Sequence, residues 1–269
     1  MEKENILVML PTSEEERQAF YRAAPEANLQ FCLPEEATRE SIRQANVIFG
    51  SPAIDDVRGS ENLRWLQSNA AGPDSYLQPG VLPQGCQLTN ASGSYGLAIS
   101  EHILGMLLML LKKLHTYRDS QHDHVWKSQG SVKSIWGSTV LVLGLGDIGG
   151  EFARRCQALG AYVIGVRRQD THKPDYVDEL HLIADLDTLL PRADVVAIAM
   201  PGTEETKGMF NDERLARMKE GSIILNVGRG SIIDTAALTR ALQSGHLSGA
   251  GLDVTDPEPL PDDCPLWDI

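Results

Sequence analysis

Residues Thr139–Arg155 read TVLVLGLGDIGGEFARR, and this stretch decides the fold of the chain. A run of strand-forming residues leads directly into a Gly-x-Gly-x-x-Gly motif, and a helical pattern follows. In such a turn Gly144 permits the tight backbone, Gly146 lets the main chain approach a pyrophosphate, and Gly149 lets helix and strand pack closely. The phosphates would lie at the helix N-terminus, where N–H groups and the helix dipole favour negative charge. The stretch predicts a dinucleotide-binding unit; the alternative is a glycine-rich turn in another α/β protein.

The residues after the next predicted strand bear on the choice of cofactor. A unit that binds NAD usually has Asp or Glu there to hold the ribose 2′-hydroxyl. This chain has Arg167 and Arg168 instead. A guanidinium cannot accept a hydroxyl proton, but it binds a phosphate well. We therefore predict that NADP(H) is preferred and that NAD(H) is the second choice. The alternative is two solvated surface arginines.

Composition excludes several classes of partner. The 269 residues are 42% hydrophobic and carry a formal net charge of −13, so the chain can form proper cores but is repelled by nucleic acid and anionic membranes. The apolar run at 6–10 predicts a strand and not a signal peptide, and the run at 103–114 is too short to span a bilayer. The four cysteines lie far apart without a Cys-x-x-Cys motif. They predict reduced thiols in a cytoplasmic protein and no metal site.

Strands and helices alternate along two α/β halves, with a boundary near residue 97. In the first half Ser13 is expected to cap a helix over 13–24 together with Glu16. Ser100 is expected to open a long, largely buried helix over 101–117. The predicted strands are 6–10, 47–50, 63–67 and 88–90 in the first half, and 140–143, 162–166, 179–182, 195–199, 223–226 and 250–254 in the second.

Two other features have open interpretations. The small-residue loop Ser68–Asp74 follows a predicted strand and offers backbone N–H groups that suit a carboxylate, but an ordinary Gly-Pro turn fits equally well. His102 is expected to be a packed or capping histidine and not a catalytic one. His115, His122 and His124 are expected on a solvated helix end and loop, with metal binding as the less favoured alternative.

Three later segments complete a family pattern. They are Met200–Gly208 (MPGTEETKG), Leu225–Asp234 (LNVGRGSIID) and Gly251–Leu260 (GLDVTDPEPL). Together with the glycine motif, in this order and spacing, they resemble the D-isomer-specific 2-hydroxyacid dehydrogenases over essentially the whole chain. The resemblance implies two doubly wound parallel-sheet α/β domains. These are a flavodoxin-like substrate-binding domain over residues 1–97 and a Rossmann dinucleotide-binding domain over residues 98–269.

The resemblance also implies hydride exchange between a nicotinamide cofactor and a small 2-oxo acid or D-2-hydroxy acid. Arg229 would grip the substrate carboxylate and polarise the 2-oxo group, and Glu258 would pair with the catalytic histidine and raise its pKa. Asp253 would hold the nicotinamide carboxamide. The implied substrate cradle is Ala70, Ala71 and Gly72 with Arg229. The implied cofactor-binding residues are Gly144, Gly146, Asp147, Ile148, Gly149, Arg167, Arg168, Pro201, Thr206, Val227 and Asp253.

The sequence departs from the family pattern in one respect. The family's proton-donating histidine lies in a Pro-His segment after the glutamate, and none of the seven histidines matches it. We therefore expect these residues to be a piece of a longer protein, or less favourably a naturally short relative. The rival functions are a non-catalytic nucleotide sensor and a formate or phosphite dehydrogenase. Family members are commonly dimers through the nucleotide-binding domain, so a homodimer is expected, with the helix at 101–117 as the candidate face.

Overall fold

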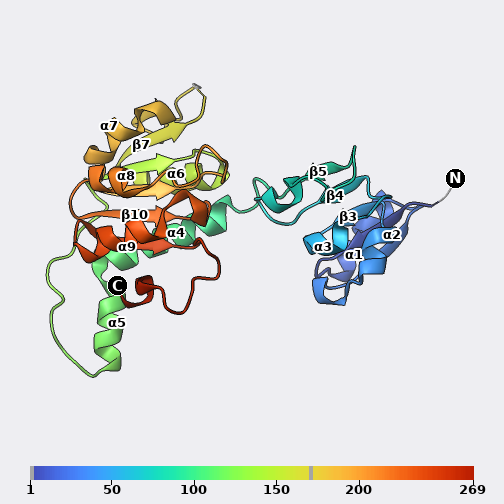
Figure 1. Ribbon diagram of the computed structural model, residues 1–269, viewed down its shortest axis with the longest axis horizontal. Coiled ribbons are helices and arrows are strands. Elements are labelled where there is room, and N and C mark those ends of the chain that lie inside the picture. Colours follow the sequence, from blue (N-terminus) through green and yellow to red (C-terminus); the bar gives the residue numbers. More distant parts are fainter. Residues whose placement is uncertain (1–2, 170–171) are drawn as a thin grey trace. The chain divides into compact units, whose positions relative to one another are not determined.

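Parallel β-sheets with helices on both faces form each half of the chain (Figure 1). The computed structural model describes residues 3–169 and 172–269. The chain divides into two compact units, Met1–Ser94 and Tyr95–Ile269. The predicted fold class, two parallel-sheet α/β domains, is confirmed. Across both described ranges, no helix combines the length and the apolar character needed to cross a membrane.

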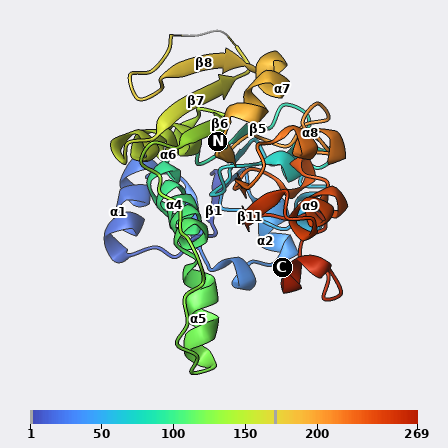
Figure 2. The ribbon, with the colours of Figure 1, turned by 90° about the vertical axis from the view of Figure 1, so that its left-hand side faces the viewer.

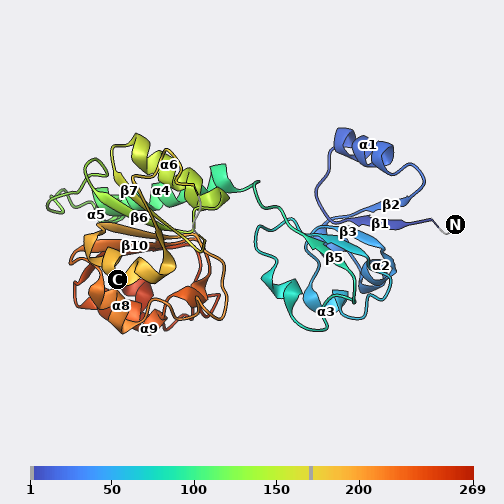
Figure 3. The same ribbon diagram turned by 90° about the horizontal axis from the view of Figure 1, so that it is seen from above.

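The first unit holds a five-stranded sheet in the order β2-β1-β3-β4-β5, which is the flavodoxin-like order. Helix α1 covers one face, where Phe20 packs edge-on against Phe31 and Phe49. Helices α2 and α3 cover the other face and bury Ile42 and Val57 (Figure 3). The elements are β1 (Asn5–Val8), α1 (Glu14–Ala23), β2 (Asn28–Phe31), η1 (Pro34–Glu36), α2 (Arg39–Gln44), β3 (Val47–Phe49), α3 (Ile54–Val57), β4 (Trp65–Gln67), η2 (Asp74–Leu77) and β5 (Gln87–Thr89).

Two details of the first unit test the local predictions. The capping box at Ser13 is confirmed, since the Glu16 N–H donates to Ser13 Oγ (3.3 Å) and the Ser13 N–H donates to the Glu16 carboxylate (2.7 Å). Strand β2, by contrast, was not predicted. It is a four-residue edge strand with exposed Asn28 and Gln30, so it lacks the continuous apolar run of the central strands.

The second unit holds a six-stranded sheet in the order β11-β10-β9-β6-β7-β8, which is the Rossmann order. Every ladder in it is parallel. The longer elements are α4 (Gly96–Lys112), α5 (Leu114–His122), β6 (Thr139–Leu143), α6 (Asp147–Ala158), β7 (Tyr162–Arg167), β8 (Glu179–Leu182), β9 (Val195–Ile198), β10 (Ser222–Asn226), α9 (Thr235–Gln243) and β11 (Leu247–Leu252). The shorter ones are η3 (Ile183–Asp185), α7 (Leu186–Leu189), η4 (Leu190–Arg192), α8 (Asp212–Arg217), η5 (Gly230–Ile232) and η6 (Pro265–Asp268).

Two apolar layers enclose this sheet. Helices α4 and α6 cover one face and α8 and α9 the other (Figure 3). Strand β6 contributes to both layers, because Val140 and Val142 join the α4–α6 core while Leu141 and Leu143 join the α7–α9 core. A strand buried on both faces reads as a continuous apolar run, which is why the glycine segment identified the centre of the sheet from sequence.

The long predicted helix is wrong at both ends. Helix α4 begins at Gly96, four residues before Ser100, because the Gly96 N–H donates to the carboxylate of Asp147 (2.7 Å). It ends at Lys112, since Lys113 adopts φ +55° and redirects the chain into α5. Figure 2 shows α5 leading away from the sheet beyond the end of α4. Most apolar residues of α4 pack against the core of their own unit, which confirms that the helix is largely buried. The dimer face expected on the helix at 101–117 stays a prediction.

Strand β11 differs from its prediction by a shift toward the N-terminus. The predicted strand was 250–254, whereas β11 spans Leu247–Leu252. Asp253 therefore lies just past the strand end. The other five strands of the sheet agree with prediction to within one residue at each end. The shift matters because residues just past the ends of parallel strands are the ones that line ligand sites in such sheets.

Candidate cofactor and substrate site

Parallel strands bring the predicted site residues of the second unit to one edge of its sheet. The glycine turn follows β6, the arginine pair closes β7, and Pro201 follows β9. Val227 and Arg229 follow β10, which pairs in parallel with both β9 and β11. Because all these strands run the same way, their carboxyl ends share one edge, where open α/β sheets bind ligands.

The glycine turn matches the requirements of a pyrophosphate site. Gly144 adopts φ +91°, and a Cβ there would lie 2.6 Å from the carbonyl oxygen of Ala199. A Cβ on Gly149 would lie 1.8 Å from the carbonyl oxygen of Gly144. At Gly146, the N-cap of α6, a Cβ would meet nothing within 4 Å. Gly144 and Gly149 thus close the turn, while Gly146 leaves open space beside the helix N-terminus where a phosphate fits.

A cavity of about 360 Å³ adjoins the glycine turn. Its lining includes Gly144, Arg167, Arg168, Pro201 and Thr206, all predicted cofactor-binding residues. The remaining lining residues are Val166, Ile183, Met200, Thr203, Glu205 and Met209. The apolar members suit a base, and the two guanidinium groups suit a phosphate.

The two arginines have different surroundings. Arg167 is partly buried, and its Nη2–H donates to the carbonyl oxygen of Leu145 inside the glycine turn (3.2 Å). Arg168 is exposed at the cavity wall. The pair therefore combines one guanidinium that braces the turn with one that faces solvent.

Asp147 and Ile148 follow the turn, but their side chains point away from the open space. The Asp147 carboxylate accepts the Gly96 N–H and so caps α4. Ile148 packs against the α4–α6 core. The Asp147 carboxylate is therefore hydrogen-bonded at the start of α4, although it lies next to the predicted phosphate site.

Asn226 organises the segment that carries Arg229. Its buried side chain donates from Nδ2 to the Arg229 carbonyl oxygen (2.9 Å), and its Oδ1 accepts the Gly228 N–H (3.0 Å). The Arg229 stem packs against Gly202, where a Cβ would lie 3.0 Å from Arg229 Cγ. Its Nη1–H donates to the Gly228 carbonyl oxygen (2.7 Å). Val227 is buried, and its N–H donates to the Ile198 carbonyl oxygen (3.0 Å).

His102 has a surrounding that the sequence interpretation missed. It is neither packed nor a cap, since its side chain is half exposed and its Nε2 lies 3.3 Å from Asp253 Oδ1. The N-cap position of α4 is Tyr95, and the side chain that accepts from its first turn is that of Asp147. The expectation for His102 is therefore wrong, because it treated the histidine as part of an isolated helix, whereas the contact depends on β11.

The other predicted residues lie outside this cluster. Glu258 is exposed in the segment after β11. In the loop after β4, in the first unit, the Ala70 N–H donates to Ser68 Oγ (3.1 Å). Asn90 Nδ2 donates to the Ala71 carbonyl oxygen (2.6 Å). The expectation of open N–H groups is thus wrong for Ala70. Within the described residues, the N–H groups of Ala71 and Gly72 make no hydrogen bond.

A family model supplies the decisive comparison. The model of the D-isomer specific 2-hydroxyacid dehydrogenase NAD binding domain matches residues 104–269. The chain belongs to the D-isomer-specific 2-hydroxyacid dehydrogenase family. The D-3-phosphoglycerate dehydrogenase of Mycobacterium tuberculosis (strain ATCC 25618 / H37Rv) is 39% identical over 210 residues, which are 77% of this chain but 39% of that protein. This 2-hydroxyacid dehydrogenase chain therefore spans well under half the length of that relative.

Solved structures of 2-hydroxyacid dehydrogenases show the same architecture. One family protein from Aeromonas salmonicida subsp. salmonicida A449 superposes with a TM-score of 0.86 at 32% identity, covering 99% of this chain and 86% of that one. Another, from Xanthobacter autotrophicus Py2 in complex with NADPH and MES, superposes with a TM-score of 0.80 at 25% identity, covering 100% of this chain and 86% of that one. The predicted family, its oxidoreductase class and its NAD-binding Rossmann domain are confirmed.

Proposed function

We propose that this chain provides the cofactor and substrate groups of an NADP(H)-dependent dehydrogenase that reduces a small 2-oxo acid to a D-2-hydroxy acid. The observation that carries the proposal is the meeting of the glycine turn, the arginine pair, Arg229 and Asp253 at one sheet edge. These groups match, in type and order, what a dinucleotide and a charged substrate require.

The chemistry follows from the groups that the chain holds at this edge. A bound nicotinamide nucleotide supplies the hydride. Arg229 binds the substrate carboxylate through its planar fork and draws electron density from the adjacent 2-oxo group. In the first unit, the backbone N–H groups of Ala71 and Gly72 are two donors of the type that binds a carboxylate. Arg229 thus orients the substrate before the bond to C2 forms.

Protonation of the new alkoxide is the second part of the proposed reaction. Glu258 is assigned as the carboxylate that pairs with a histidine acid, since a neighbouring negative charge favours the protonated imidazole and raises its pKa. The exposed position of Glu258 after β11 supports this role, because the carboxylate remains accessible to such a partner.

The NADP(H) preference rests on Arg168 and Arg167 in the cavity beside the glycine turn. No carboxylate closes β7, where an NAD-binding unit holds the ribose 2′-hydroxyl. The related Xanthobacter structure contains NADPH, which supports this choice.

Binding and turnover together test the proposed function. Titration of the chain with NADPH and NADH is expected to give tighter binding of NADPH. A protein that also supplies the histidine acid is expected to oxidise NADPH with one or more small 2-oxo acids. Formate and phosphite belong in the same panel, in the oxidative direction. Equal affinity for the two nucleotides contradicts the cofactor assignment. Binding without turnover on any substrate, in a protein that supplies the histidine acid, favours a sensor.

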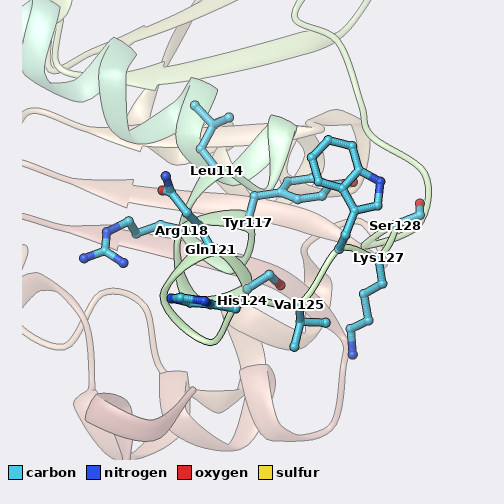
Figure 4. Close-up of a pocket in the computed structure, with 10 residues that line it drawn as sticks. Leu114, Tyr117, Arg118, Gln121, His124, Val125, Lys127 and Ser128 are labelled. Carbon is cyan, nitrogen blue, oxygen red and sulfur yellow. The ribbon is translucent and has the colours of Figure 1, made fainter.

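We also propose that the chain forms a homodimer through α5 and the segment after it. Leu114, Tyr117, Val125 and Trp126 are exposed there, and Trp126 is fully so. They line a hollow together with Arg118, Ser120, Gln121, His124, Lys127 and Ser128 (Figure 4). Exposed aromatic side chains gathered on one protruding element are typical of an interface.

Light scattering after size exclusion tests the dimer. The unaltered chain is expected to have twice its monomer mass, and Trp126→Glu is expected to shift it to monomer. Leu77→Glu, at an exposed apolar residue of the first unit, is the matched control and is expected to change nothing. A monomeric unaltered chain, or equal effects of both variants, contradicts the proposal.

A further inference from the structure

His102 and Asp253 face each other where α4 packs against β11. His102 Nε2 lies 3.3 Å from Asp253 Oδ1, and the two side chains are 54% and 46% exposed. A carboxylate has two oxygens, each able to accept hydrogen bonds. Asp253 can therefore accept from His102 through one oxygen and from an outside ligand through the other.

The packing of α4 determines where His102 lies. A Cβ on Gly251 would lie 3.2 Å from Met106 Cβ, and a Cβ on Gly249 would lie 3.1 Å from Leu110 Cδ2. Residues four apart lie on one face of a helix. His102, Met106 and Leu110 thus meet positions 253, 251 and 249 in turn, and the two glycines let the helix approach closely. His102 is aimed at Asp253 by this register.

The backbone of Asp253 is held separately from its side chain. Its N–H donates to the Asn226 carbonyl oxygen (3.0 Å). The side chain of the same asparagine fixes the segment that carries Arg229. Asn226 therefore places Asp253 and Arg229 in one frame, but it does not choose the rotamer of the Asp253 carboxylate. His102 contacts this carboxylate.

We propose that His102 is a positioning residue for the cofactor. Its Nε2 lies within reach of Asp253 Oδ1. A proton on Nε2 would hold the carboxylate so that Oδ2 accepts an N–H of the nicotinamide carboxamide. This inference rests on the proposed function, which gives Asp253 the carboxamide. A carboxylate held in its binding rotamer loses less side-chain freedom when the ligand arrives, and so binds it more tightly.

Calorimetric titration of the full chain with three probes tests the inference. NADP⁺ carries the carboxamide, its 3-acetylpyridine analogue replaces the amide with a ketone that has no N–H, and adenosine 2′,5′-bisphosphate lacks the nicotinamide altogether. His102→Leu removes the donor, and His102→Gln keeps one at a similar reach. His115→Leu, at an exposed histidine of α5, is the matched control. Thermal unfolding of each variant shows that it is folded.

His102→Leu is expected to weaken NADP⁺ binding about three- to tenfold, the typical net effect of one hydrogen bond. Binding of the other two probes is expected to change by less than about twofold, and His102→Gln is expected to recover most of the loss. After Asp253→Asn, His102→Leu is expected to add little, since the two residues act as a pair.

Two results overturn the inference while the proposed function stands. One is unchanged NADP⁺ binding in His102→Leu; the other is equal weakening for all three probes, which indicates a general disturbance of the fold. A wild-type chain that binds none of the probes rejects the nucleotide site itself, and the role of His102 with it.

Discussion

Arg167 and Arg168 stand side by side in sequence, yet their environments predict different effects on cofactor choice. Arg168 is exposed at the cavity wall, so Arg168→Asp is expected to weaken NADPH binding about tenfold or more and to leave NADH binding nearly unchanged. Arg167 also braces the glycine turn through Leu145, so Arg167→Asp is expected to weaken both nucleotides. Fluorescence titration with each nucleotide measures the difference.

Arg217→Asp provides the control for this pair. It makes the same change of charge on α8, where it removes a surface ion pair with Glu213. An Arg217→Asp variant that shifts the NADPH-to-NADH ratio as much as Arg168→Asp does would show that net charge, and not a phosphate contact, governs the preference.

Arg229 is expected to act through the shape of its guanidinium. Arg229→Lys keeps the positive charge but loses the planar fork, so 2-oxo-acid reduction by a catalytically complete protein is expected to fall about ten- to a hundredfold. Cofactor affinity is expected to stay within about twofold, since Arg229 is assigned to the substrate. Steady-state kinetics and a separate NADPH titration measure the two effects. Near wild-type turnover would reject Arg229 as the substrate anchor.

At the residue scale, the sequence predicts the positions of groups that belong to a local motif. The glycines and arginines beside the turn were predicted because strand, turn and helix are contiguous there. The contact of His102 with Asp253 joins residues far apart in the chain and depends on how α4 lies on β11. The spacing of His102, Met106 and Leu110 was visible, but nothing in it specified β11 as the partner.

At the element scale, different glycines of the turn are expected to serve stability and cofactor binding. Gly149→Ala places a Cβ against the Gly144 carbonyl, so it is expected to lower the free energy of unfolding by about 1–3 kcal/mol. Gly146→Ala meets open space and is expected to cost less than about 1 kcal/mol at this N-cap. It is nevertheless expected to weaken NADPH binding, because the methyl group occupies the phosphate space. Urea unfolding and NADPH titration of both variants measure these effects.

The opposite pattern would contradict this account of the turn. If Gly146→Ala binds NADPH as well as the unaltered chain, the open space is not where the phosphates lie. If Gly149→Ala unfolds at the same urea concentration, the close approach of turn and helix is not required.

Helix ends show why some elements were predictable and others were not. Helix α1 is capped by Ser13 and Glu16, three residues apart, so its start could be predicted from neighbouring letters. Helix α4 is capped by Asp147, which is 51 residues away, so its start was misplaced at Ser100. A positive φ at Lys113 ends α4, although the apolar pattern continues beyond it. Local sequence cannot reveal a cap or a break that tertiary contacts supply.

At the scale of the whole molecule, the stability of an acidic chain depends on which carboxylates form ion pairs. Arg192 and then His181 hold the pKa of Glu179 at about 2, below its usual 4.5. Glu179 joins β8 to the short helix η4 through Arg192 Nη1 (3.0 Å), and it also contacts His181 Nε2 (2.8 Å). Its side chain is 26% exposed, so solvent screens the pair only in part. The network ties the edge of the second sheet to the segment that follows it.

This network predicts how stability depends on pH. A carboxylate with a lowered folded pKa stabilises the fold above its unfolded pKa, and the stabilisation is lost as the pH falls through the folded value. Glu179→Gln is expected to lower the free energy of unfolding by about 1 kcal/mol at neutral pH. The gap is expected to shrink as the pH falls from about 4.5 toward about 2. Urea unfolding across this range measures it.

Glu213→Gln serves as the comparison for Glu179. It breaks the pair with Arg217, in which Glu213 is 71% exposed, and surface pairs of this kind contribute about 0–1 kcal/mol. A gap for Glu179→Gln that stays constant over the whole pH range would show that packing, and not charge, accounts for its effect.

The bond from Gly96 to Asp147 gives the molecule a built-in probe. An amide proton held by a hydrogen bond exchanges with solvent only when that bond opens. Because the acceptor is the residue directly after Gly146, deuterium uptake at Gly96 records the opening of the dinucleotide turn from 51 positions away. The chain enters its second unit at Tyr95, next to the same proton. The exchange rate of the Gly96 amide therefore measures how often the hydrogen bond between this entry point and the turn opens.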